Sequence, residues 1–127
     1  MSNAQEIAAI TDLMHQYFDC LYEADHIGMA KVFHPEARYI NTVNGEYVNC
    51  STQEYINILE ERVPPRERGD ARNDEILSIE SESENMAFVK VRLTMMDREY
   101  LDYLTLYKSD NQWRIICKVF SFKPLPH

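Results

Sequence analysis

The stretch REYLDYLTLYKSDNQWRIICKVFSF, residues 98–122, decides the fold, because it has the pattern of two strands joined by a turn. Apolar and polar side chains alternate on both sides of the SDNQ segment, which is typical of strands with one buried face. If SDNQ closes the hairpin, the pairing places Asp102 opposite Val119. Asp102 is then a lone carboxylate among apolar neighbours, and the direction of its side chain is the first question.

A second hairpin gives a separate register for Asp102. If Asp97 and Arg98 form the turn before the stretch, Leu93 lies opposite Asp102. Both registers place Asp102 on the same face as a set of apolar side chains. This predicted core face carries Val89, Val91, Leu93, Met95, Leu104, Leu106, Ile115, Cys117 and Val119. Asp102 is therefore predicted to point into the core.

The opposite face of these strands mixes aromatic and basic side chains. It is predicted to carry Phe88, Lys90, Arg92, Tyr103, Thr105, Tyr107, Arg114, Ile116, Lys118 and Phe120. A face of this composition often marks a protein contact, so a homodimer through this outer sheet face is expected. The alternative is a sheet surface covered by the long stems of its lysines and arginines.

The rest of the chain predicts three helices and four more strands. The helices are expected at residues 5–24, 26–33 and 51–62, and the strands at 37–43, 46–50, 75–81 and 86–96. Asn44-Gly45 predicts a hairpin turn, and Ser51 with Glu54 predicts a capping box for the third helix. The order indicates a single α+β domain over residues 1–127, with helices on one face of a mostly antiparallel sheet.

Composition restricts the classes of partner. The 127 residues carry a formal net charge of -8, which disfavours nucleic acid and anionic membrane surfaces as partners. No apolar run approaches the ~18 residues of a membrane helix, and the N-terminal residues lack the pattern of a signal peptide. Three cysteines without a C-x-x-C pair fit a reducing compartment, so a cytoplasmic location is expected.

Two stretches of the chain resemble a known superfamily. They are YFDCLYEADHIGMAKVFHPEARY, residues 17–39, and LDYLTLYKSDNQWRIICKVFSF, residues 101–122. They resemble the nuclear-transport-factor-2-like superfamily, in particular its branch named putative lumazine-binding, which is related to polyketide cyclase and ketosteroid isomerase-like proteins. The resemblance implies a cone-like, cystatin-like fold with a long N-terminal helix packed in a curved sheet. It also implies an apolar pocket at the wide end and dimerisation through the outer sheet face.

Asp102 and His34 are the candidate catalytic residues. A buried carboxylate is expected to have a raised pKa and could act as a general base, as inward carboxylates do in ketosteroid isomerases of this superfamily. The alternative is a structural Asp102 that accepts a hydrogen bond from Tyr17, a backbone N–H or a buried arginine. His34 could move protons near neutral pH, or it could brace the turn at Pro35.

The remaining candidates are expected to line a pocket. The predicted ligand-binding residues are Tyr17, Phe18, Phe33, Tyr39, Leu93, Met95, Tyr100 and Val119. No histidine or cysteine spacing indicates a metal site, and no nucleotide or cofactor motif is present, so neither a metal nor a cofactor is expected. The arginine-rich loop at residues 62–74 could close over the pocket and hold an anion, or it could be a solvated loop.

Three functions remain open from the sequence. The first is binding of a small, largely apolar organic ligand between the first helix and the sheet, with Asp102, Tyr17 and His34 at its polar end. The second is a cofactor-free isomerase, dehydratase or cyclase that uses Asp102 as general base. The third is a structural or partner-binding dimer whose cavity is filled by its own side chains.

Overall fold

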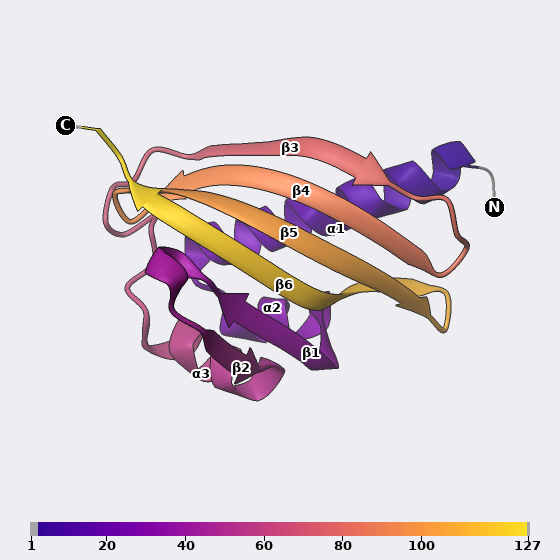
Figure 1. Cartoon of the computed structure of the whole chain (residues 1–127), viewed down its shortest axis with the longest axis horizontal. Helices are drawn as coiled ribbons and strands as arrows, with labels where there is room; N and C mark the ends of the chain where they lie inside the picture. Colours follow the sequence, from indigo (N-terminus) through magenta and orange to yellow (C-terminus); the bar gives the residue numbers. More distant parts are fainter. Residues whose placement is uncertain (1–2, 127) are drawn as a thin grey trace.

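Six strands form one sheet in the computed structural model, which describes residues 3–126 (Figure 1). The strands are β1 (Phe33–Asn41), β2 (Val48–Ser51), β3 (Asn73–Glu80), β4 (Met86–Met95), β5 (Arg98–Ser109) and β6 (Gln112–Pro124). The order across the sheet is β2-β1-β6-β5-β4-β3, and every neighbouring pair is antiparallel except β1 and β6. The predicted α+β class with a mostly antiparallel sheet is confirmed.

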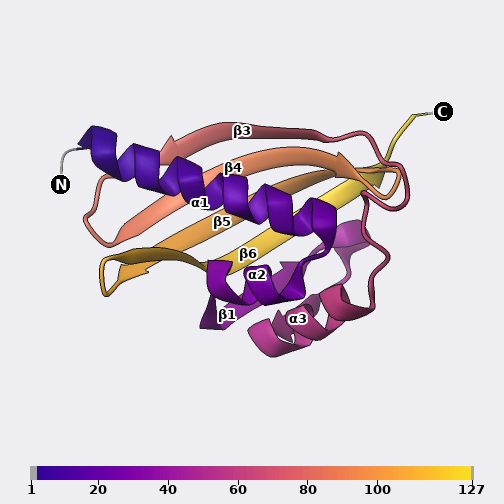
Figure 2. The same ribbon diagram turned by 180° about the vertical axis from the view of Figure 1, so that it is seen from behind.

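Three helices lie on the same side of the sheet (Figure 2). They are α1 (Asn3–Glu23), α2 (His26–Val32) and α3 (Thr52–Glu61). The long helix α1 runs across the sheet and buries one stripe of side chains, among them Ile10, Met14, Tyr17 and Leu21. Spacings of three and four residues place this stripe on one face of the helix, so the predicted amphipathic helix is confirmed.

Two local sequence signals act as predicted. The Ser51 hydroxyl accepts a hydrogen bond from the Glu54 N–H at 3.1 Å, and the Glu54 side chain accepts one from the Ser51 N–H at 3.0 Å. This capping box satisfies two groups at the start of α3. Asn44 and Gly45 both have positive φ, and they lie in the short helical turn η1 (Val43–Gly45) that joins the antiparallel strands β1 and β2.

The turn between β4 and β5 differs from the prediction. It is formed by Met96 and Asp97, which have φ angles of 52° and 61°, rather than by Asp97 and Arg98. A methionine with positive φ is uncommon, so its sequence gives no turn signal. The register slips by two residues, and Asp102 pairs with Val91 instead of Leu93. Because an even slip preserves the face, Asp102 still points inward and is only 1% exposed.

A bulge in β6 overturns part of the predicted core face. Leu106 pairs with Ile115 as expected, but Thr105 then pairs with Cys117, so the ladder leaves Ile116 as an extra residue. A slip of one residue exchanges the two faces of a strand. After the bulge, Lys118 and Phe120 point into the core, whereas the prediction placed them on the outer face. Cys117 and Val119, predicted to face the core, alternate with these buried residues and face outward.

The bulges also shape the sheet. The β3–β4 ladder has a second irregularity, between Ile76 and Ser78, and bulged strands bend and twist more strongly than regular ones. The sheet curves over α1, as Figures 1 and 2 show from its two sides. The curvature leaves a pocket near the start of β5 and the end of β6, where the ends of β1 and α3 also meet.

Candidate ligand-binding pocket

The interior pocket has a volume of about 300 Å³. This lies at the lower end of the ~300–1,000 Å³ that is usual for small-molecule sites. Its walls combine aromatic rings, methionines and basic side chains. The lining residues are Tyr39, Asn41, Tyr55, Arg62, Met95, Met96, Arg98, Tyr100, Lys118, Phe120 and Phe122. The pocket is thus built from five separate parts of the chain.

Lys118 forms the floor of this pocket and is only 3% exposed. Four aromatic rings surround its ammonium group at close range. The distances from Nζ to the ring centroids are 4.9 Å for Phe120, 5.1 Å for Tyr55, 5.2 Å for Tyr17 and 5.3 Å for Tyr39. The negative faces of such rings attract a cation, and they also exclude water from it. Lys118 therefore lies in an aromatic cage that opens on the pocket.

Asp102 and Tyr17 lie behind the lysine. The Tyr17 hydroxyl donates a 2.5 Å hydrogen bond to Asp102 Oδ2, and Lys118 Nζ is 3.9 Å from the same oxygen. The other oxygen, Asp102 Oδ1, is buried without a hydrogen-bond partner among residues 3–126. Neither Asp102 nor Tyr17 is among the residues that line the pocket. Lys118 thus separates the carboxylate from any molecule in the cavity.

Burial controls protonation in this cluster. Removal from water lowers the pKa of Lys118 to about 8, although Asp102 opposes the shift and Arg62 adds to it. Burial raises the pKa of Tyr17 well above its usual value, and the neighbouring Asp102 raises it further, so Tyr17 remains a neutral hydrogen-bond donor. Burial likewise raises the pKa of Tyr55, whose hydroxyl has no hydrogen-bond partner within the described residues.

Two arginines complete the pocket nearer to solvent. Arg62, which follows α3, is half-buried, and Arg98 at the start of β5 is exposed. The other arginines of the predicted loop, Arg66, Arg68 and Arg72, form ion pairs with acidic side chains. Only the first arginine of that loop therefore contributes to the pocket. Together with the buried lysine, the lining residues include three cations and no acidic side chain.

Four of the predicted ligand-binding residues lie at this pocket. Tyr39, Met95 and Tyr100 line it, and Tyr17 contacts its floor through the lysine cage. The rings of Tyr39 and Tyr55 stack with centroids 4.4 Å apart, which forms one wall. The sequence therefore placed Tyr39 of this wall at the pocket, but not its stacking partner Tyr55.

The other four predicted ligand-binding residues lie elsewhere. Phe18 and Leu93 are buried between α1 and the sheet beside a crevice of about 20 Å³, which is too small for a ligand. Phe33 is buried at the start of β1, where its ring centroid is 5.2 Å from that of Tyr55. Val119 faces outward because of the bulge. These residues support the fold around the pocket rather than line it.

His34 lies at the end of β1 away from the pocket. Its Nδ1 accepts a hydrogen bond from the Glu36 N–H at 3.0 Å, and its carbonyl accepts one from the Thr52 hydroxyl at 2.7 Å. It is not among the residues that line the pocket. These bonds span Pro35 and connect β1 to the start of α3, as the structural interpretation of His34 expects.

Sequence reasoning missed Lys118 as a site residue, although a signal for its direction was present. In the last strand, Trp113 has an odd residue number, whereas Phe120 and Phe122 have even ones. A regular strand would place these rings on opposite faces, so the change indicates an extra residue between them. With that bulge, Lys118 falls on the same face as Phe120. Arg98 was missed because the preceding turn was placed one residue too late.

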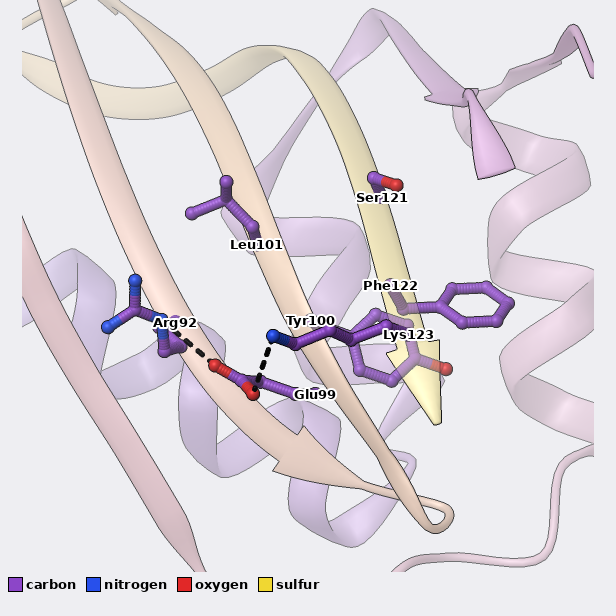
Figure 3. A pocket seen from close by; sticks show the side chains of 7 residues that line it. All are labelled: Arg92, Glu99, Tyr100, Leu101, Ser121, Phe122 and Lys123. Carbon is purple, nitrogen blue, oxygen red and sulfur yellow. Dashed lines mark ion pairs between the residues drawn. The ribbon is translucent and has the colours of Figure 1, made fainter. Parts of the chain in front are cut away.

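A second hollow lies on the outer face of the sheet (Figure 3). It has a volume of about 280 Å³ and is formed by Arg92, Glu99, Tyr100, Leu101, Ser121, Phe122 and Lys123. Glu99 lies 3.2 Å from Arg92 and 3.8 Å from Lys123, so the charges in this hollow already pair with one another. The interior pocket has no acidic side chain in its lining, and neither Arg62 nor Arg98 forms an ion pair within the described residues, so it is the stronger candidate.

Neither a metal site nor a membrane-spanning helix is found among residues 3–126. No group of three or more histidine, cysteine or acidic side chains is placed to hold a metal ion. No helix in this range combines the length and the apolar character that crossing a bilayer requires.

The geometry agrees with the family to which the chain belongs. Residues 5–121 match the family described as "Putative lumazine-binding", and the chain is a member of that family. This match confirms the predicted putative lumazine-binding branch, and the fold is nuclear-transport-factor-2-like, as predicted. A search of curated proteins finds no match to the chain.

Solved structures confirm the fold over nearly the whole chain. A nuclear-transport-factor-2-like protein of unknown function from Silicibacter pomeroyi superposes with a TM-score of 0.85 at 23% identity, covering 97% of this chain and 100% of that one. A similar protein from Shewanella baltica gives 0.84 at 18% identity, covering 98% of both chains. A cystatin-like domain from Nostoc punctiforme gives 0.76 at 18% identity, covering 97% of this chain and 80% of that one. At these identities the similarity establishes the fold alone.

Proposed function

We propose that this protein binds a small organic anion with an aromatic body in the interior pocket. The observation that carries the proposal is the charge of the lining: Arg62, Arg98 and Lys118 face the pocket, and no acidic side chain does. This concentration of positive charge occurs in a chain with a net charge of -8. A concave site with one sign of charge concentrates ligands of the opposite sign.

The pocket offers complementary contacts for both parts of such a ligand. The stacked rings of Tyr39 and Tyr55 and the ring of Phe120 provide a flat apolar wall for an aromatic body. The guanidinium groups of Arg62 and Arg98, closer to solvent, suit a carboxylate or another planar anion. This proposal keeps the apolar body expected from the sequence and adds an anionic group.

Ligand binding explains more of the geometry than the two alternatives, which are catalysis with Asp102 as general base and a cavity filled by the protein's own side chains. Asp102 lies behind Lys118 and does not line the pocket, so it has no direct path to a ligand as a general base. A cavity filled by its own side chains is difficult to reconcile with a volume of about 300 Å³. It also does not explain why the Tyr55 hydroxyl has no hydrogen-bond partner among residues 3–126.

The proposal is tested by NMR titration with a panel of one-ring and two-ring aromatic carboxylates, 4-methylbenzoate among them. Lumazine, the compound in the family description, forms a separate arm. Saturable shifts are expected around the pocket, and the uncharged amide of each acid should bind about 10-fold more weakly, because charge-assisted hydrogen bonds contribute ~1.5–3 kcal/mol. Arg98→Gln should weaken binding similarly, whereas Arg66→Gln, which removes a surface ion pair, should not.

Failure of all the carboxylates to bind would contradict the proposed function. The same conclusion would follow if the carboxylates and their amides bound equally well. Binding of lumazine alone, with no effect of Arg98→Gln, would replace the anion with a neutral heterocycle as the ligand.

We also propose a homodimer through the outer sheet face. Met86, Tyr103 and Tyr107 are 61%, 42% and 40% exposed there, and Met86 lies directly opposite Tyr107 on the neighbouring strand, which favours a protein contact at this face. Sedimentation velocity should show a dimer at micromolar concentration, and Tyr103→Glu should shift it to monomer. A monomeric wild-type protein would contradict the dimer without affecting the pocket.

A further inference from the structure

We infer that Lys118 is an amine nucleophile that forms a Schiff base with an aromatic aldehyde or ketone whose ring also carries a carboxylate. The inference rests on the proposed function, because it concerns the same pocket and the same anionic ligand. It adds a reactive carbonyl group at the inner end of that ligand.

The position of the amine is the first support. Among the residues that line the pocket, Lys118 is the only one with a primary amine, and it is only 3% exposed. Its Nζ makes no hydrogen bond within residues 3–126, and the nearest carboxylate oxygen, on Asp102, is 3.9 Å away. A nitrogen that no acceptor holds can turn its lone pair toward the cavity once it is neutral.

The protonation of the amine is the second support. Only the neutral amine attacks a carbonyl carbon, and a buried lysine loses its proton more readily than an exposed one. The pKa of Lys118 is lowered to about 8, so a substantial fraction is neutral near physiological pH. The charged and titratable groups around it are Asp102 from β5, Tyr17 from α1, Tyr39 from β1, and Tyr55 and Arg62 from α3 and its end.

The third support is the orientation that a ligand would take in the pocket. Arg62 and Arg98 lie toward solvent and Lys118 lies at the floor. A ring with a carboxylate at one end and a carbonyl at the other could therefore contact both sites at once. The aromatic wall between them would hold the ring, and it would keep water from the carbonyl carbon.

The reaction is a condensation with no change of oxidation state. The Nζ lone pair forms a bond to the carbonyl carbon, and the C=O π electrons move to oxygen, which takes up a proton. The nitrogen loses a proton, for which Asp102 is the carboxylate within reach, and the product of this stage is a carbinolamine. The nitrogen then loses its second proton and the hydroxyl takes up one more, so that the nitrogen lone pair forms the C=N bond while the C–O bond breaks and releases water. The product is an imine between Lys118 and the ligand. Asp102, held by Tyr17, stabilises the positive charge of the protonated imine.

The inference is tested by trapping with 4-formylbenzoate and sodium cyanoborohydride, which reduces an imine to a stable secondary amine. Peptide mass spectrometry should map the adduct to Lys118, at a rate at least about 10-fold above that of exposed Lys123, since the neutral fraction of an amine rises tenfold per unit fall in its pKa. The labelling rate should rise with pH up to about 8 and then level off.

Two variants serve as controls. Lys118→Arg keeps a cation at the floor but cannot form the imine, so the adduct should disappear while the protein remains folded. Lys123→Met removes an exposed lysine outside the pocket and should leave the trapping rate unchanged. Equal labelling of all lysines, or a rate that persists in Lys118→Arg, would overturn the inference.

The failures of the two proposals are distinguishable. If 4-methylbenzoate binds but 4-formylbenzoate gives no Lys118 adduct, the Schiff base is excluded and anion binding stands. If benzaldehyde labels Lys118 as fast as 4-formylbenzoate and no carboxylate binds, the amine is reactive and the anion preference is wrong. Protection of Lys118 by 4-methylbenzoate is the result expected if both are correct.

Discussion

Two lysines with little exposed surface lie on the two long strands of the sheet, Lys108 near the end of β5 and Lys118 in the middle of β6, in contrasting surroundings. Lys108, near the end of β5, forms a 3.0 Å ion pair with Glu6 of α1. The other Glu6 oxygen accepts a hydrogen bond from the Trp113 indole N–H at 3.1 Å. Both carboxylate oxygens are satisfied, and the three residues join the first turns of α1 to the last hairpin.

Lys118 lies in a similar triad that is incomplete. Its partner Asp102 is 3.9 Å away, one Asp102 oxygen accepts from Tyr17, and the other has no partner among residues 3–126. Buried polar groups are nearly always hydrogen-bonded, and exceptions cluster where a protein binds or reacts. The comparison indicates that the Lys108 cluster holds the fold together and that Lys118, the member of its cluster that lines the pocket, is available to a ligand.

The largest effect on stability is expected from Glu6→Ala. This change leaves Lys108 and Trp113 without their partner in a largely buried place, so the free energy of unfolding should fall by about 3 kcal/mol. Urea denaturation measures the loss. Anion binding in the distant pocket should be retained under folding conditions. An unchanged free energy of unfolding would mean that the cluster is not structural.

A smaller effect separates the two lysines directly. Lys108→Met removes a 3.0 Å ion pair and should lower the free energy of unfolding by ~1–3 kcal/mol. Lys118→Met removes a longer ion pair and also the cost of burying an ammonium group, and Asp102 keeps its hydrogen bond from Tyr17, so its loss should be smaller than that of Lys108→Met. Urea denaturation of both variants at pH 7 gives the comparison. An equal loss of unfolding free energy in the two variants would contradict the proposed difference between the Lys108 and Lys118 clusters.

The smallest expected effect is a dependence on pH. Lys118 has a pKa of about 8 in the folded protein, against ~10.4 for an unfolded lysine, so the unfolded chain binds more protons between these values. The free energy of unfolding of the wild type should therefore rise, relative to Lys118→Met, by about 1.5 kcal/mol between pH 8 and pH 9.5. Denaturation at several pH values measures this difference. A difference that falls as the pH rises would have the wrong sign.

The sequence predicted the fold because its local signals are regular. The apolar stripe of α1, the Ser51–Glu54 capping box and the turn before Gln112 each determine an element or a register on their own. The inward direction of Asp102 also followed, since the unexpected turn at Met96 moved the register by an even number of residues. Tyr17, one of the partners considered for Asp102, does donate a hydrogen bond to it.

The pocket was only partly predictable because it depends on a bulge. One extra residue, Ile116, reverses the faces of β6 beyond it, and a pattern of strict alternation then assigns Lys118 to the surface. The sequence also does not show which arginine of the loop lines the pocket. Arg62 differs from the other three because those form ion pairs with acidic side chains, and the sequence alone does not reveal these pairs. The bulge and two of these ion pairs depend on contacts between residues that are far apart in the sequence, and local sequence patterns give no information about such contacts.

The most direct test of the account is the pKa of Lys118 in solution. It can be measured by NMR titration of protein labelled in the lysine side chains, with the signal assigned by its loss in Lys118→Arg. Burial in the aromatic cage predicts a pKa of about 8, well below the ~10.4 of an ordinary lysine. A pKa at or above ~10.4 would show a solvated or fully paired ammonium, and it would contradict the claim that this cluster is open to a ligand.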